Sequence, residues 1–112
     1  MTKARFQVLF ETEIAQVFDT FTQDQLDRYA RFSQMSELSR EGKITYLART
    51  SLEYTPENRI VETSTKTVAF LREAAAQREV RGGVIAPGMK LLLALCDCLE
   101  RAVETYKTEE VS

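Results

Sequence analysis

The chain has 112 residues, of which 44% are hydrophobic and 29% are charged, a balance that fits one globular domain and not a disordered segment. It has no histidine, no tryptophan and two cysteines. Because histidine is the commonest acid–base group and metal ligand near neutral pH, this composition excludes histidine-dependent catalysis and most zinc sites.

The charge balance argues against nucleic acid and membrane as partners. Lys and Arg total 15 against 17 Asp and Glu, which gives a net charge of −2, whereas nucleic-acid-binding domains usually carry a basic excess. No apolar run approaches the roughly 20 residues that cross a bilayer. Glu11 and Glu13 occupy the segment where a signal peptide would be apolar. We therefore expect an intracellular, cytoplasmic protein that does not contact nucleic acid directly.

The segment 6–21 has apolar side chains at the three- and four-residue spacing of an amphipathic helix. We interpret this stripe as core, and docking into a partner's groove is the alternative. The polar run 22–25 has the form of a capping box and predicts the start of a second helix, which should loosen before Gly42. The stripe of the first helix consists of Phe6, Phe10, Ile14, Val17, Phe18 and Phe21.

The segments 43–52 and 56–81 predict two further helices. In the second of them, Thr55 has the character of an N-cap and Pro56 that of a first helical residue. Neither glycine nor proline follows until Gly82, where a left-handed stop is expected. The helix should therefore have about 26 residues and be the longest element.

Residues 87–106 predict the last helix, whose first half is apolar on nearly every side, so other helices or a second subunit must surround it. The polar residues 107–112 are expected to fray. The whole pattern predicts a single all-α domain over 1–112, a bundle of about five helices. It comprises N-terminal helices within 1–35, a core three-helix unit over 43–106 whose last two helices form the centre, and a polar tail.

Few residues are candidates for catalysis, ligand binding or metal binding, and ordinary structural roles explain them. Asp24 and Asp27 share a helix face, but the helix dipole favours carboxylates near an N-terminus. For the hydroxyl cluster of residues 63–67 we favour close helix packing over ligand binding. Cys96 and Cys98 point about 200° apart on a helix, so they should form neither a disulfide nor a shared metal site and are interpreted as small buried apolar residues. We expect no catalytic residue, no cofactor and no metal, with a carboxylate- or tyrosine-based enzyme as the least favoured hypothesis.

The order of a short helix, a long helix and a further helix over residues 43–106 is similar to the histone fold. Just upstream, residues 21–32 (FTQDQLDRYARF) resemble the acidic-Gln-Leu-x-Arg-Tyr segment that precedes the histone fold in one of the TFIID subunits, the histone-fold TATA-binding-protein-associated factors. The resemblance implies a long central helix crossed by two flanking helices, a handshake dimer and a nuclear location. The loops lack the basic residues by which histones grip phosphates, which argues against contact with DNA.

The leading hypothesis is a non-enzymatic protein–protein interaction module or assembly subunit, histone-fold-like and related to transcription regulation. It would join a protein partner, or another copy of itself, by burying apolar faces of the last two helices. The alternative is a self-contained small helical bundle that acts as a regulator or adaptor, bacterial or viral. The expected interaction residues are Ile60, Val68, Leu71, Leu92, Leu95 and Leu99.

Overall fold

Four α-helices and one 3-10 turn form the regular structure of the part of the chain that is described. The structure, a computed structural model, describes residues 2–20, 38–80 and 87–111. The prediction of an all-α fold is confirmed for these residues, and the second helix expected to start at 22–25 lies outside them. The elements are α1 (Lys3–Phe18), α3 (Arg40–Leu52), η1 (Glu57–Arg59), α4 (Ile60–Val80) and α5 (Pro87–Val111).

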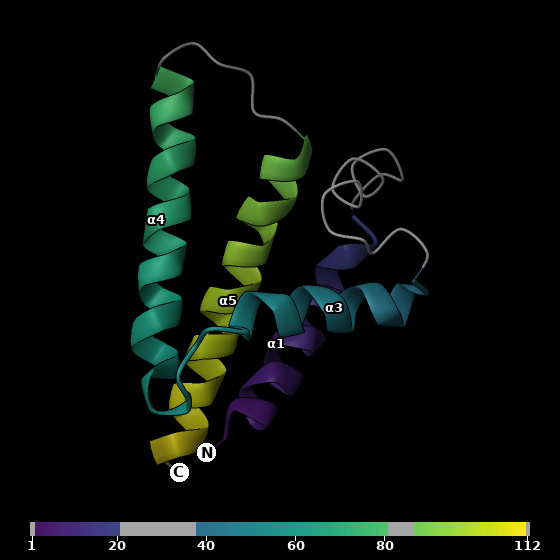
Figure 1. Cartoon of the computed structure of the whole chain (residues 1–112), viewed down its shortest axis with the longest axis vertical. Coiled ribbons are helices and arrows are strands. Elements are labelled where there is room, and N and C mark those ends of the chain that lie inside the picture. The colour runs from purple at the N-terminus through teal and green to yellow at the C-terminus, as the bar shows by residue number, and fades with distance from the viewer. Residues whose placement is uncertain (1, 21–37, 81–86, 112) are drawn as a thin grey trace.

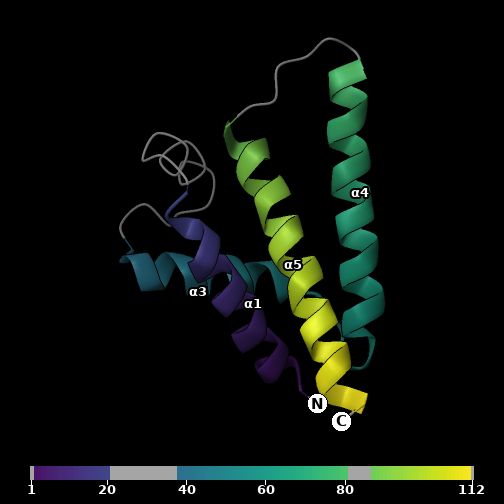
Figure 2. The ribbon, with the colours of Figure 1, turned by 180° about the vertical axis from the view of Figure 1, so that it is seen from behind.

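Helix α5 occupies the central position, with α1 against one side and α4 against the other (Figures 1 and 2). Both neighbours run antiparallel to α5, and α3 packs against α1 and crosses it (Figure 1). The expectation that the last two helices form the centre together is therefore corrected. Helix α4 is an outer helix, because the buried surface of α5 extends around to α1 as well.

Helix α1 packs as its sequence predicts, but it runs from Lys3 to Phe18 whereas the predicted segment is 6–21. The Thr2 hydroxyl accepts a hydrogen bond from the Arg5 amide at 3.2 Å, which caps the first turn. The members of the stripe at four-residue intervals are buried, as its interpretation as core predicts; Val17 is partly buried against them, and Phe21 lies outside the described residues. The buried residues of α1 are Phe6, Phe10, Ile14 and Phe18.

Helix α3 ends at Leu52 as predicted but begins at Arg40, three residues before the expected start. Ser39 is the N-cap, and its hydroxyl accepts from the Gly42 amide at 3.1 Å, so Gly42 lies within the first turn instead of before it. Polar contacts join α3 to α1 and its C-cap: Arg40 pairs with Asp19 at 3.1 Å and donates to the Ala15 carbonyl at 3.3 Å, and the Thr45 hydroxyl donates to Glu11 at 2.7 Å. The apolar face of α3 is buried, as its spacing predicts.

The predicted start of the long helix at Pro56 is wrong. Pro56 has an extended backbone, with φ −64° and ψ 140°, and it precedes the 3-10 turn η1, so the α-helix begins only at Ile60. Thr55 is buried and does not cap, and no side chain caps η1. The Glu57 carboxylate instead accepts from the backbone amide of Lys3 at 3.0 Å. The first turn is thus held by the start of α1, a contact distant in sequence.

The predicted end of the last helix at Tyr106 is also wrong. Helix α5 continues to Val111 and has 25 residues against 21 in α4, so α5 is the longest element among the described residues. Contacts to α1 hold these turns: the Tyr106 and Phe6 rings meet edge to face with centroids 5.4 Å apart, and Arg5 pairs with Glu109 at 2.6 Å. The expected frayed tail is therefore helical through Val111.

Truncation of Phe6 should show how much the α1–α5 contact stabilises the fold. Phe6 is fully buried, so Phe6→Ala should lower the free energy of unfolding by about 3–5 kcal/mol, as measured by urea unfolding. Val8 on the same helix is 50% exposed, and Val8→Ala should cost less than about 0.5 kcal/mol. Equal losses in the two variants would contradict the assignment of the stripe to the core.

The Arg5–Glu109 pair predicts a pH effect of defined sign. The hydrogen bonds that Arg5 donates, at 3.1 and 2.6 Å, are the main cause of a Glu109 pKa below its usual value. A carboxylate with a lowered pKa stabilises the fold above the pKa of the unfolded chain, and this contribution is lost as the pH falls through the folded pKa. NMR titration of Arg5→Gln should therefore find a higher pKa for Glu109, and an unchanged value would refute the pairing.

Candidate functional site

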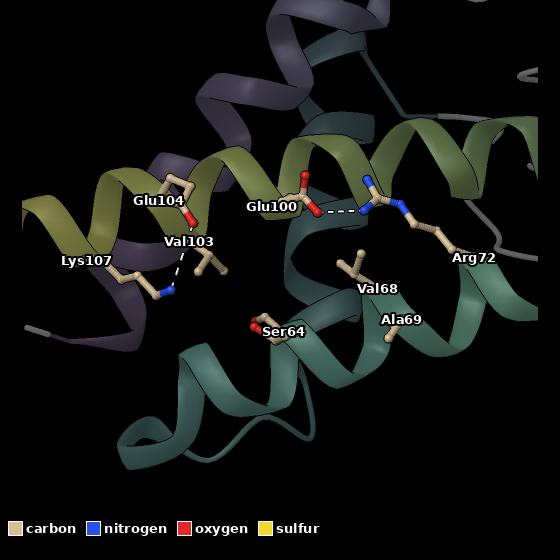
Figure 3. A pocket seen from close by; sticks show the side chains of 9 residues that line it. Ser64, Val68, Ala69, Arg72, Glu100, Val103, Glu104 and Lys107 are labelled. Carbon is tan, nitrogen blue, oxygen red and sulfur yellow. Dashed lines mark hydrogen bonds and ion pairs between the residues drawn. The ribbon is translucent and has the colours of Figure 1, made fainter.

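A groove with a volume of about 310 Å³ lies between α4 and α5 (Figure 3). We call it the α4–α5 groove. Its α4 wall is made mostly of short side chains, so the two helices do not fill the space between them with their own atoms. The lining residues are Ser64, Thr65, Val68, Ala69 and Arg72 from α4, and Glu100, Val103, Glu104 and Lys107 from α5.

Arg72 spans from α4 to α5 at one end of the groove. Its guanidinium pairs with Glu100 at 2.6 Å and with Asp97 at 2.7 Å. The hydrogen bonds that it donates, first to Glu100 and then to Asp97, raise the pKa of Arg72 above its ordinary value. Two carboxylates already occupy this guanidinium, so it is not free to bind an anionic ligand.

Ser64 faces α5 from the middle of the groove's α4 wall (Figure 3). The residue is only 2% exposed, in agreement with the packing interpretation of the hydroxyl cluster at 63–67. Thr65 and Thr67 of the same cluster are exposed and Thr63 is half-buried. The Ser64 hydroxyl has no hydrogen-bond partner among the described residues.

A second surface lies on another flank of α4. Residues at 63, 67, 70 and 74 share one helix face, and we call this stripe the Phe70 face. Phe70 is 72% exposed, and Thr67 and Ala74 beside it are also exposed. Consecutive helical residues point about 100° apart, so Ala69 contributes to the groove while Phe70 points away from it.

Four of the six expected interaction residues are buried inside this chain. Ile60, Val68, Leu95 and Leu99 have exposures of 2–6%. Leu71 and Leu92 are partly buried and pack against the same core. The six side chains thus belong to the core of one chain or pack against it, and their role in association stays a prediction.

Sequence reasoning missed Phe70 although the signal was present. The buried stripe of α4 consists of Ile60, Ser64, Val68 and Ala75 with Leu71 partly buried, and Phe70 falls outside this spacing. A large aromatic residue off the apolar stripe of a helix is expected to be exposed. The groove gave no comparable signal, because its α5 wall depends on how two distant segments align.

The two cysteines are free and buried, as predicted. Burial is the main cause that raises the pKa of the Cys98 thiol to about 11. Arg101 donates to the Cys98 sulfur at 3.6 Å, and the same guanidinium pairs with Glu13 of α1 at 2.7 Å. Because the thiolate is the reactive form, Cys98 is a poor nucleophile at neutral pH.

The remaining features to consider are the acidic pair, metal binding and membrane crossing. The pair Asp24 and Asp27 lies outside the described residues. Within the described ranges, no group of three or more Cys, Asp or Glu residues could hold a metal ion. In those ranges no helix combines the length and apolar character that crossing a membrane requires.

Comparisons with protein-family models, curated proteins and solved structures found no significant match to this chain.

The raised pKa of Cys98 predicts that alkaline pH destabilises the fold. A thiol whose folded pKa exceeds its unfolded value of 9.0 contributes stability below that value and loses it as the pH rises toward about 11. The free energy of unfolding should therefore fall by at most ~3 kcal/mol more in the wild type than in Cys98→Ala over this interval. Urea unfolding across the pH range measures the difference, and parallel pH profiles would contradict it.

Proposed function

We propose that this chain is a non-enzymatic protein–protein interaction module that binds a helix of its partner through the Phe70 face. The exposure of Phe70, at 72%, is the observation that carries the proposal. Exposed aromatic side chains are typical of interface anchors. On the helix surface Phe70 has the uncharged Thr67 and Ala74 on one flank and the charged Lys66 and Glu73 on the other. Thr67 and Ala74, one turn before and one turn after, are short enough for another helix to approach closely.

The more specific form of this proposal is a histone-fold-like assembly subunit related to transcription. The order of α3, α4 and α5 supports it, since a short helix is followed by two longer ones. The arrangement departs from a long middle helix crossed by two flanking helices, because α5 is longer than α4 and lies at the centre. Residues 21–32, which carry the resemblance to a TFIID subunit, lie outside the described residues. A protein partner or a second copy of the chain would then occupy the Phe70 face.

The alternative is a self-contained bundle that acts as a regulator or adaptor. The burial of Ile60, Val68, Leu95 and Leu99 within one chain favours it, because a handshake dimer would need such faces for the second chain. The two forms differ in whether folding depends on association. For a self-contained unit the unfolding midpoint does not move with protein concentration, whereas for an associating one it does.

Phe70→Glu tests the proposal, because a charge on a side chain that is 72% exposed leaves the core intact, whereas Leu95→Asp would bury a charge. If the partner is a second copy, sedimentation velocity should show association of the wild type that Phe70→Glu weakens at least ~30-fold. If the partner is another protein, capture from a cell extract should retain it on the wild type and lose it on Phe70→Glu.

Val8→Glu is the matched control, since it places the same charge on an exposed apolar residue of α1. It should bind as the wild type does. Circular dichroism of both variants should show the helical content of the wild type. The absence of any association, with itself or another protein, that responds to Phe70→Glu but not to Val8→Glu would overturn the proposal.

A further inference from the structure

Among the described residues, Ser64 has the only buried side-chain nitrogen or oxygen without a hydrogen-bond partner. The hydroxyls of Thr12, Thr50, Ser51, Thr105 and Thr108 donate to the carbonyl four residues earlier. The Ser64 hydroxyl makes no such bond and is enclosed between α4 and α5. Nearly all buried polar side-chain atoms in proteins have a partner, so an exception calls for an explanation.

Packing alone does not explain the hydroxyl group. Alanine is almost as small as serine, is a better helix former and would bury no unsatisfied polar atom. Close approach of α5 therefore accounts for a small residue at position 64 but not for its oxygen. The oxygen is accounted for if a further molecule bonds to it.

The α4–α5 groove gives such a molecule a place. Its volume of about 310 Å³ lies at the lower end of the range for small-molecule sites. Val68 and Ala69 on one side and Val103 on the other provide apolar walls beside Ser64 (Figure 3). Sites for small ligands commonly combine apolar walls with few polar groups.

The charges that line the groove indicate a neutral ligand. They comprise two cations, Arg72 and Lys107, and two carboxylates, Glu100 and Glu104. Arg72 pairs with Glu100 at 2.6 Å, and Lys107 lies 3.9 Å from Glu104. A charged ligand would have to compete with these pairs, and a neutral one would not.

We propose that the α4–α5 groove binds a small, neutral, mostly apolar molecule with one hydrogen-bonding group, and that the Ser64 hydroxyl bonds to this group. Ser64 lines the groove with its hydroxyl oxygen shielded from solvent, so the proposal requires the hydroxyl to rotate about its single side-chain torsion toward the ligand. This site is separate from the Phe70 face, so each proposal can fail while the other stands.

The test uses N-phenyl-1-naphthylamine, a neutral aromatic probe with one N–H group whose fluorescence increases in apolar sites. Its anionic counterpart, 8-anilino-1-naphthalenesulfonate, has the same ring system with an added sulfonate. The neutral probe should bind the full chain saturably and at least tenfold more tightly than the anionic probe. Ser64→Ala should weaken binding of the neutral probe three- to tenfold while leaving the protein at least as resistant to urea.

Two tryptophan variants locate the bound probe. Ala69→Trp fills the groove and should abolish binding, whereas Ala74→Trp makes the same change on the Phe70 face and should leave binding unchanged; both alanines are exposed, so neither change disturbs the core. Failure of the neutral probe to bind, or binding unaffected by both Ser64→Ala and Ala69→Trp, would overturn the proposal. Equal affinity for the two probes would overturn the neutral ligand class.

Discussion

The apolar surface of α5 must be covered on two sides, and the rest of the fold depends on this constraint. Cys96 and Cys98 show it most directly, because they point about 200° apart on the helix and yet are 2% and 0% exposed. Burial is the main cause that raises the pKa of both thiols, but the charges acting on them differ: Arg72 of α4 lowers the pKa of Cys96, and Glu13 of α1 raises that of Cys98, so the two thiols face different neighbours. One covering helix could not bury both.

The two covering helices differ in the side chains that they provide. Helix α1 contributes three phenylalanines and an isoleucine, which fill the space against α5 and α3. Helix α4 contributes smaller residues such as Ser64, Val68 and Ala75. A narrow stripe of small side chains buries one line of contact and leaves the flanks of α4 uncovered. The groove and the Phe70 face both follow from this difference.

Ion pairs connect these helices but contribute little to their stability. Arg101 with Glu13 and Arg5 with Glu109 join α1 to α5, while Arg72 joins α4 to α5. These arginine side chains are 41–47% exposed, and exposed pairs are worth about 0–1 kcal/mol each. Their effect is to favour one alignment of the helices, which burial of apolar surface alone specifies poorly.

Sequence patterns predicted the features that depend on residues close together in the chain. The stripe of α1, the end of α3 at Leu52 and the burial of both cysteines follow from spacing and composition. The start of α4 did not follow from local spacing, because the Glu57 carboxylate accepts a hydrogen bond from the Lys3 amide, 54 residues away in the sequence, instead of capping the helix that follows it. The end of α5 likewise depends on Arg5, which is 104 residues from Glu109. Sequence separation, and not weak propensity, limited these predictions.

The α4–α5 groove could not be predicted from the sequence for the same reason. A groove exists only where two helices meet, and the nearest residues of the two walls of this one, Arg72 and Glu100, are 28 positions apart in the sequence, so no motif contains it. Phe70 could have been found from α4 alone, but its exposure depends on which side α5 covers. Since Ala69 and Phe70 point about 100° apart, occupation of one surface leaves the other open. Binding at the two surfaces is then linked only to the extent that it shifts α4 against α5.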